Sequence, residues 1–250
     1  MSDAIRVGVI GVGYLGRFHA RIYNDMPGVE LVGVVDTDRE TADRIAAEYD
    51  TRALYDPMAL LDHVDVVSVV VPTSLHRQVA VPYLEKGIHM LLEKPVASTL
   101  EDAKVIVETA RKHNATLQIG HLERFNAGIM ALADHVNKPR FIEAHRLGPF
   151  VERATDVDVV TDLMIHDIDI ILSLVGDKLS SIAATGTPVL TNHVDIANAR
   201  LEFTNGAVAN VTASRVSSKK FRRIRVFSRN SYRAINFVDQ QLEVAYPGDI

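Results

Sequence analysis

The chain contains no cysteine. This absence excludes disulfides, thiolate metal sites and cysteine nucleophiles together, and it is consistent with a reducing cytoplasm. Long apolar runs are missing as well. Residues 66–71 and 168–175 fall far short of the roughly 20 residues that span a bilayer, and residues 7–12 are too short a run for a signal-peptide core. We therefore expect a soluble, cytoplasmic protein with no membrane partner.

Neither sign of charge dominates. The 27 basic and 32 acidic residues give a net charge of −5, so no global field draws the protein to nucleic acid. With 47% apolar and 24% charged residues, the composition is that of an ordinary globular protein. A length of 250 residues allows one large domain or two of about half that size, and either can bury a core.

The first half alternates short β-branched runs with longer segments of helical periodicity. The pattern predicts strands at residues 5–10, 29–35, 64–71, 88–92 and 116–119, and helices at 14–24, 39–49, 75–86 and 100–113. Strands that are apolar throughout and separated by helices indicate a parallel sheet covered on both faces. We predict a doubly wound α/β domain of the Rossmann type over residues 1–120.

The second half has a different pattern of apolar and polar residues. It predicts helices at 125–135 and 159–175, the latter ended by Gly176, and strands at 140–146, 181–187, 193–203, 207–215, 222–227 and 233–237. The dipeptide Asn205-Gly206 is a strong hairpin signal between two of these strands. Residues 121–250 are thus predicted to form an α+β domain with a mainly antiparallel open sheet, serving substrate binding and oligomerisation.

A glycine-rich turn joins the first predicted strand to the first helix. Gly11, Gly13 and Gly16, with Tyr14 and Leu15 between them, match G-x-G-x-x-G. The first glycine permits the turn, the second lets a pyrophosphate approach the backbone, and the third allows close helix packing. The helix N-terminus offers free N–H groups to phosphates.

An acidic residue supports the dinucleotide interpretation. Asp36 ends the second predicted strand, 20 residues after Gly16, where a carboxylate binds ribose hydroxyls, and Thr37 follows it. The carboxylate favours NAD over NADP because it would repel a 2′-phosphate. Arg39 leaves NADP open, since a nearby arginine can accommodate that phosphate.

Three further motifs follow: Val71-Pro72-Thr73-Ser74-Leu75-His76, Glu93-Lys94-Pro95 and the segment from Asp162 through His166 to Asp169. With the glycine loop, they resemble the glucose–fructose oxidoreductase/inositol dehydrogenase (Gfo/Idh/MocA) family over the whole chain. Val159, Val160 and Met164 stand where the family usually has glycines. Family members generally continue beyond Ile250, so either the chain is a shortened variant or its last strands lie outside this sequence.

The resemblance implies NAD(P)-dependent oxidation or reduction of a ring carbinol on a sugar or cyclitol. It implies that Lys94 contacts substrate, that His166 is the general acid/base, and that Asp162 orients His166 or holds a substrate hydroxyl. It also suggests a cis Lys94–Pro95 bond. The residues that it places around the cofactor are Val71, Pro72, Thr73, His76 and Glu93, together with Lys94.

Independently of the family, Asp162, His166, Asp169 and Ser173 form one polar stripe on an otherwise apolar helix. Burying carboxylates and an imidazole without a purpose would be costly, which favours catalysis. An internal hydrogen-bond network is the alternative, and for Asp162 a helix-cap role. These residues could ligate a metal, but a hydride-transferring enzyme that retains Lys94 needs none, and we expect no metal.

The segment Glu123-Arg124-Phe125-Asn126 resembles the family branch that oxidises the 3-hydroxyl of UDP-N-acetylglucosamine-type sugars. Arg124, Asn126, Arg146 and Arg153 could serve a phosphorylated or nucleotide-linked substrate, because guanidinium groups match phosphate geometry. A structural role is the alternative for each of them taken singly. A nucleotide sugar is the first hypothesis. Inositol or a free sugar is the second, and a non-catalytic NAD-binding sensor or scaffold is a third.

Two features of the second half concern partners. Residues 215–233 hold eight basic residues and no acid, which fits a solvated sheet face, phosphate contact or, least of all, RNA binding. The predicted strands have too few helices to cover both sheet faces. The uncovered face, which bears Ile196 and Val208, predicts a homodimer or homotetramer, as sheet-face dimers occur in the family it resembles; a solvated face is the alternative.

Overall fold

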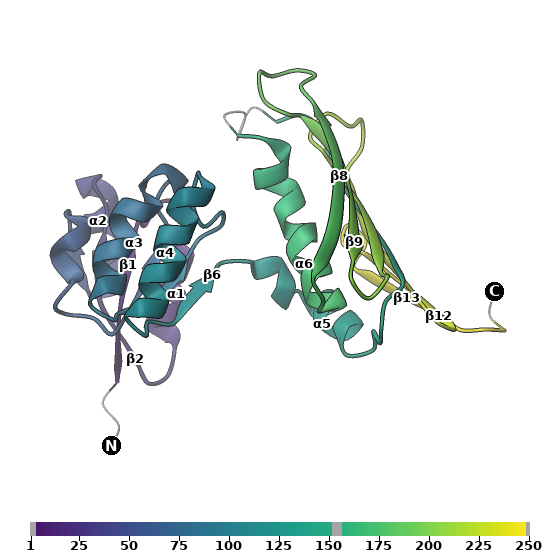
Figure 1. The fold of residues 1–250 in the computed structure, drawn as a ribbon. Helices are drawn as coiled ribbons and strands as arrows, with labels where there is room; N and C mark the ends of the chain where they lie inside the picture. Colours follow the sequence, from purple (N-terminus) through teal and green to yellow (C-terminus); the bar gives the residue numbers. More distant parts are fainter. Residues whose placement is uncertain (1–3, 152–156, 249–250) are drawn as a thin grey trace. The chain divides into compact units, whose positions relative to one another are not determined.

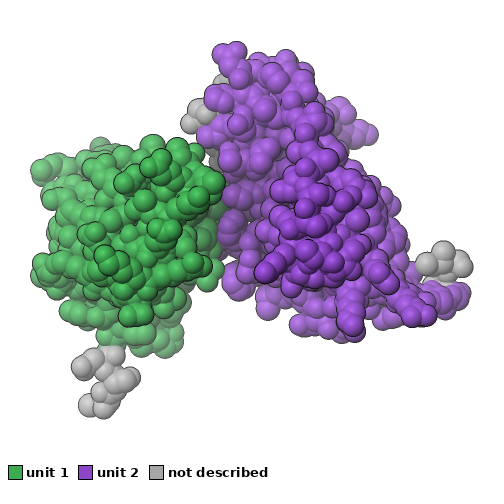
Figure 2. Space-filling model, viewed as in Figure 1, with its two compact units in different colours: residues 1–120 green, residues 121–250 purple. Residues whose placement is uncertain are grey.

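The computed structural model describes residues 4–151 and 157–248. The chain divides into two compact units, residues 1–120 (unit 1) and 121–250 (unit 2), which Figure 2 shows in different colours. Among the helices that lie in the described ranges, none combines the length and the apolar composition needed to cross a membrane.

Unit 1 is built on a six-stranded parallel sheet with the strand order β3-β2-β1-β4-β5-β6 (Figure 1). Its strands are β1 (Ile5–Ile10), β2 (Val29–Val35), β3 (Arg52–Leu54), β4 (Val66–Val69), β5 (His89–Leu92) and β6 (Leu117–Ile119). The order reverses between β1 and β4, as in dinucleotide-binding doubly wound sheets. The predicted Rossmann fold is confirmed.

Helices cover both faces of this sheet. They are α1 (Gly16–Asp25), α2 (Arg39–Glu48), α3 (His76–Glu85) and α4 (Leu100–Lys112), with 3₁₀ turns η1 (Pro57–Leu60) and η2 (Thr73–Leu75). Ala20 of α1 and Ile45 of α2 share one core with Val9 and Val34, whereas α3 and α4 contribute to the other core. Both faces of the strands are therefore buried, which explains their continuous apolar runs.

Local signals set the helix ends in unit 1. The Thr99 side chain accepts a hydrogen bond from the Asp102 N–H at 3.1 Å and caps α4. Acidic side chains then occupy the first turn of α4 and basic ones its last turn, which complements the helix dipole. Asp38 caps α2 in the same way, through the Glu40 N–H at 3.1 Å.

Unit 2 contains a seven-stranded sheet with the order β13-β12-β11-β7-β10-β9-β8, in which only the β7–β10 pair is parallel. Its strands are β7 (Phe141–Leu147), β8 (Leu179–Thr187), β9 (Ile196–Phe203), β10 (Val208–Ser214), β11 (Phe221–Ser228), β12 (Ser231–Asn236) and β13 (Gln241–Ala245). The mainly antiparallel α+β unit is as the sequence predicts.

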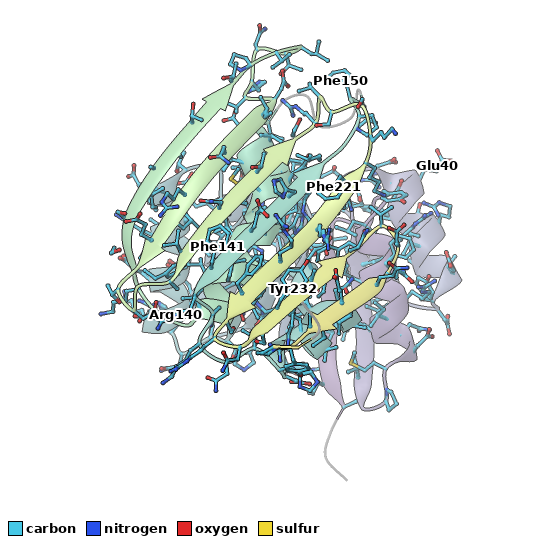
Figure 3. The ribbon with its side chains drawn as sticks, turned by 90° about the vertical axis from the view of Figure 1, so that its right-hand side faces the viewer. Glu40, Arg140, Phe141, Phe150, Phe221 and Tyr232 are labelled. Atoms are coloured by element: carbon cyan, nitrogen blue, oxygen red, sulfur yellow. The ribbon has the colours of Figure 1, made fainter. Side chains whose placement is uncertain are left out.

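One face of this sheet carries the core, and the other is open. Helices α5 (Ala127–Ala133) and α6 (Ile165–Val175) pack on the inner face, where alternate residues of β9 from Ala197 to Phe203 are at most 5% exposed. Figure 3 looks onto the opposite face, where Phe141, Phe221 and Tyr232 are labelled. That face presents Ile196 and Val208.

The predicted long helix at 159–175 is not uniform. Residues Val160–Met164 form a π-helical turn, and the α-helix begins at Ile165. As predicted, Gly176 ends α6 in the left-handed conformation, at φ 63°. A 3₁₀ turn, η3 (Leu122–Phe125), precedes α5. The helix is also less enclosed than expected: Val160 and Leu172 are 36% and 38% exposed, because only one side of α6 faces the sheet.

Candidate active site

The glycine loop has a shape that fits a dinucleotide. Gly11 adopts φ +86°, and a Cβ there would lie 2.5 Å from the Val70 carbonyl oxygen. A Cβ on Gly16 would lie 1.8 Å from the Gly11 oxygen, whereas one on Gly13 would meet open space. Among the residues that the structure describes, no side chain caps the N-terminus of α1 and no acid lies in its first turn, so its N–H groups suit a pyrophosphate. Tyr14 and Leu15 are exposed on this loop.

Asp36 lies at the carboxyl end of β2 beside this loop. Its carboxylate accepts hydrogen bonds from the Val12 and Asp38 N–H groups, each at 3.0 Å. Each oxygen retains a lone pair for a ribose hydroxyl. The guanidinium of Arg39 lies over the Tyr55 ring, 4.2 Å from its centroid, so it has a partner within unit 1. Thr37 is exposed between these residues.

The segment after β4 presents Val71 and Thr73 half-buried and Pro72 exposed. His76 differs, because its side chain is only 1% exposed. Its ring nitrogens lie 3.0 Å from the Val71 carbonyl oxygen and 3.3 Å from that of Val96. His76 therefore links the ends of two segments that border the predicted cofactor site, and its own expected place around the cofactor stays a prediction.

Glu93 is also an internal residue, 7% exposed. Its Oε1 lies 3.3 Å from Nε2 of His19, whose Nδ1 lies 3.2 Å from the Ser68 hydroxyl. The Tyr23 hydroxyl lies 2.8 Å from the same Ser68 oxygen. A side chain on Gly120 would collide with Glu93, at 2.7 Å. Sequence reasoning missed this buried network. The expected contact of Glu93 with the cofactor stays a prediction.

Lys94 follows Glu93 at the carboxyl end of β5 and is half-buried. The expected cis bond between Lys94 and Pro95 is confirmed. In unit 1, all of the predicted cofactor residues lie at or beyond the carboxyl ends of β1, β2, β4 and β5, the edge at which open α/β sheets bind ligands.

In unit 2, Asp162 lies in the π-helical turn and His166 in the first turn of α6, and both are half-buried. The π-turn is of a kind found frequently at functional sites. Asp167, which sequence reasoning passed over, is the more deeply buried carboxylate, at 1% exposed. Within the described residues, no cluster of three or more potential ligands could hold a metal ion.

Arg146 lies at the centre of a buried ion-pair cluster. Its Nε and Nη2 donate to the two oxygens of Asp167, each at 2.9 Å, and its Nη1 donates to Glu123 at 3.1 Å. Burial opposes the charge, but the hydrogen bonds and charges of the two carboxylates raise the pKa of Arg146. Arg146 is 3% exposed and has an internal structural role in this cluster, while its expected contact with substrate stays a prediction.

Two other expected substrate residues also have internal partners. Arg124 donates to both oxygens of Asp169, with Nε at 3.0 Å from Oδ2, and this pairing raises the pKa of Arg124. Asn126 caps α5 by accepting a hydrogen bond from Gly128 at 3.0 Å. Asn126 thus caps a helix and Arg124 is an ion-paired residue that is 43% exposed, and the expected contact of both with substrate stays a prediction. Arg153 lies outside the described residues.

Arg222 is the second residue of β11. The sequence indicated only the basic segment that contains it, not Arg222 itself. It is half-buried, and burial together with the like charge of Arg146 lowers its pKa, whereas Glu123, Asp167 and Asp162 act in the opposite direction. The excess of basic residues at 215–233 was the signal that pointed to it.

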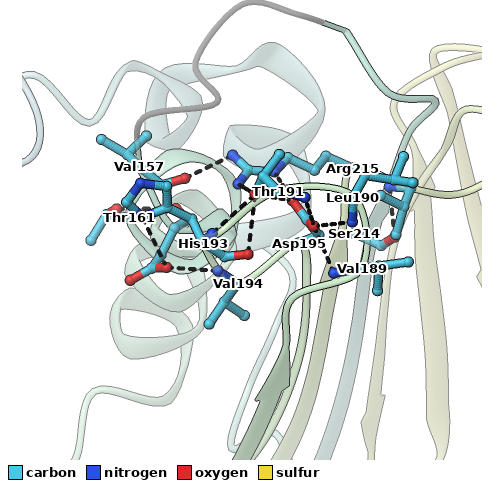
Figure 4. A network of polar contacts seen from close by, with 12 residues as sticks. Val157, Thr161, Val189, Leu190, Thr191, His193, Val194, Asp195, Ser214 and Arg215 are labelled. Atoms are coloured by element: carbon cyan, nitrogen blue, oxygen red, sulfur yellow. Dashed lines mark hydrogen bonds and ion pairs between the residues drawn. The ribbon is translucent and has the colours of Figure 1, made fainter.

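A second buried ion pair, between Asp195 and Arg215, is shown in Figure 4. Asp195 accepts hydrogen bonds from three successive backbone N–H groups, 189 to 191, at 2.7–2.9 Å, and from Arg215 Nε at 2.7 Å. Burial opposes ionisation, but these bonds hold the pKa of Asp195 well below its usual range. Arg215 also donates to the Val157 carbonyl at 2.7 Å, so the network fixes loops of unit 2.

Comparison with known proteins decides the family. Residues 5–121 match the oxidoreductase family with an NAD-binding Rossmann fold, and residues 104–231 match the GFO/IDH/MocA C-terminal domain. The chain is 41% identical over 245 residues to the UDP-N-acetylglucosamine 3-dehydrogenase of Acidithiobacillus ferrooxidans, covering 98% of this chain and 78% of that one. The chain belongs to the Gfo/Idh/MocA family.

It is therefore an oxidoreductase with an NAD-binding Rossmann domain, and the resemblance inferred from the motifs is confirmed. A solved structure of the Acidithiobacillus enzyme superposes with a TM-score of 0.91, at 40% identity, covering 98% of this chain and 81% of that one. The scyllo-inositol 2-dehydrogenase (NAD(+)) of Bacillus subtilis is 28% identical over 238 residues, 87% of this chain and 69% of that enzyme.

Proposed function

We propose that this family member oxidises the 3-hydroxyl of a nucleotide sugar of the UDP-N-acetylglucosamine type, with NAD as the hydride acceptor. The observation that carries the proposal is the 41% identity, over nearly the whole chain, to an enzyme named for that reaction. The segment from Glu123 to Asn126 supports it, and the half-buried Arg222 and exposed Arg124 are the guanidinium groups that we assign to the phosphates.

The chemistry assigns one task to each of three side chains. NAD, when bound at the glycine loop, supplies the electrophilic carbon that accepts hydride. His166 takes the hydroxyl proton onto its imidazole, and Asp162 holds His166 or a substrate hydroxyl in position. The ammonium group of Lys94 donates a hydrogen bond to the same oxygen and stabilises the negative charge that develops there. The residues retained at these three positions argue against a non-catalytic NAD sensor.

For the cofactor we propose NAD rather than NADP. Asp36 is held beside the glycine loop by two backbone N–H groups, where its charge would repel a 2′-phosphate. The guanidinium of Arg39, the group that could compensate, lies on the ring of Tyr55.

For assembly we propose a homodimer or homotetramer in which the open face of the unit 2 sheet packs on a second copy. That face presents Phe141, Phe221 and Tyr232 as well as Ile196 and Val208, and the labelled aromatic side chains are visible in Figure 3. A sheet face that no helix of its own unit covers is a candidate surface for pairing with a second copy. Light scattering at micromolar concentration should show a species larger than 27.6 kDa.

Turnover assays test the catalytic assignment. Lys94→Ala and His166→Ala should each lose most NADH production from UDP-N-acetylglucosamine while retaining NADH binding by fluorescence. Lys86→Ala and His63→Ala, which remove an exposed lysine and an exposed histidine elsewhere, are matched controls and should behave as wild type. Normal turnover in either test variant would reject the assignment.

A substrate panel separates the alternatives. UDP-hexosamines, free hexoses and inositols should be assayed in parallel at equal concentration. Activity on inositol alone would favour the second hypothesis, to which the Bacillus subtilis relative lends support. Tight NAD binding with no turnover of any carbinol would favour a sensor or scaffold.

A further inference from the structure

A basic pocket lies at one end of the unit 2 sheet. It has a volume of about 770 Å³ and is enclosed by the segment before β7, the β9–β10 turn and the β11–β12 turn. Arg140 and Phe141, labelled in Figure 3, mark this end of the sheet. The volume is within the range of small-molecule sites.

The charge in this pocket is of one sign. Its lining includes Lys138, Arg140, Arg229 and Arg233, and it includes no aspartate or glutamate. Across the described ranges, none of these four cations forms an ion pair within 4.0 Å. The electrostatic potential of the pocket therefore favours an anion.

Arg233 sets this pocket apart from an ordinary basic surface. Among the described residues, three arginines are buried: Arg146, Arg215 and Arg233, at 3%, 5% and 7% exposed. The first two are each paired with a buried carboxylate, Asp167 and Asp195. Arg233 has no such carboxylate. Its Nη1 donates to the Ser231 hydroxyl at 2.7 Å, and its guanidinium lies 5.8 Å from the Tyr246 ring centroid.

Two polar atoms of the pocket residues lack hydrogen-bond partners within the described structure. They are Nε of Arg233 and the hydroxyl oxygen of Ser228, and both are buried. A buried guanidinium loses its hydration, and leaving a donor unpaired adds to that cost. An anion in the pocket would offset the lost hydration of the Arg233 guanidinium, which lines the pocket, because anion oxygens accept charge-assisted hydrogen bonds from such donors.

The pocket is separate from the residues assigned to chemistry. Within unit 2, it adjoins the start of β7, whereas Arg146, which holds Asp167 of α6, lies five residues beyond Phe141 in β7. At about 3.4 Å per residue, that separation is roughly 17 Å. We propose that this pocket is a second ligand site, which binds the phosphoryl group of a small phosphorylated metabolite or free phosphate.

Calorimetric titration of the purified full chain, saturated with NADH to occupy the dinucleotide site, tests the proposal. Inorganic phosphate and glycerol 3-phosphate are titrated separately at constant ionic strength. Saturable binding of either, with one site per chain, is expected. Tighter binding of the phosphomonoester would identify a metabolite as the ligand, and equal binding would identify the free ion. Absence of saturable binding of both would overturn the proposal.

Variants locate the site. Arg233→Met should weaken binding at least tenfold. Because a buried substitution can impair folding, the double variant Lys138→Ser/Arg229→Ser, at two exposed positions, provides an independent measurement and should weaken binding at least fivefold. Lys219→Ser/Lys220→Ser removes the same charge from exposed positions outside the pocket and should leave binding unchanged. An equal loss in this control would show non-specific attraction and refute the site.

Discussion

The Arg146–Asp167 pair offers a direct test of how unit 2 is held together. Both side chains are buried, at 3% and 1% exposed, and two hydrogen bonds of 2.9 Å join them. Removing Arg146 leaves Asp167 as an uncompensated buried charge, which costs about 3–5 kcal/mol, whereas removing Asp167 leaves Arg146 with Glu123 as a partner. Arg146→Met should therefore lower the free energy of unfolding by that amount, and Asp167→Leu should lower it by less. At about 2–4 °C per kcal/mol, the melting temperature of Arg146→Met should fall by roughly 6–20 °C.

The double variant Arg146→Met/Asp167→Leu is expected to recover most of the stability that the single variants lose. With both charges replaced by apolar groups, no buried ion remains, and its stability should return to within about 1–2 kcal/mol of wild type. Glu123 loses a partner, but its side chain is 26% exposed and can be hydrated. Urea unfolding followed by circular dichroism measures all four proteins. An Arg146→Met variant within about 1 kcal/mol of wild type, or a double variant equal to the sum of the singles, would refute this account.

Three further predictions concern single residues. Gly16→Ala should weaken NADH binding at least tenfold by fluorescence titration, because its Cβ would lie 1.8 Å from the Gly11 oxygen; unchanged affinity would contradict the loop geometry. Asp36→Ser should lower the ratio of kcat/KM with NAD to kcat/KM with NADP. A wild-type enzyme that prefers NADP would contradict the carboxylate argument. The pKa of Asp195 is lowered from 3.8, so its stabilisation is present above that pH and is lost as pH falls below it. The difference between the urea midpoints of wild type and Asp195→Asn should therefore decrease between pH 6 and pH 2.5 without vanishing; a constant difference would exclude this linkage.

The fold was largely predictable because most elements of unit 1 carry their own local signals. The missed strands are those that lack such signals. Arg52–Leu54 is only three residues long, and Gln241–Ala245 is an edge strand that is mostly exposed, so neither shows a buried apolar pattern. The π-turn at Val160–Met164 interrupts a segment whose apolar composition is continuous, so periodicity alone predicted a single helix.

The residues of the candidate site likewise fall into those that local motifs predict and those that they do not. The glycine loop, Asp36 and Lys94 were found because they belong to local motifs beside strand ends. Pairings between distant segments were not found. Asp167 was passed over because the polar stripe of the helix pointed to its neighbour His166, and only the position of β7 brings Arg146 to the adjacent face. His19 and Glu93 likewise meet only once β1 and β5 are placed in one sheet.

The central position of β7 in its sheet implies an order of assembly during synthesis. In unit 1, the first paired strands join residues such as Ile5 and Val29, so the sheet can start to form from short chain segments. In unit 2, the partners of β7 are synthesised much later. Phe141 of β7 pairs with Val208 of β10 on one side and with Phe227 of β11 on the other. Sheets with such non-local pairings fold slowly. We expect the nucleotide-binding half to be complete while the ribosome is still extending the second half, whose apolar inner strand face stays partly uncovered until β11 emerges.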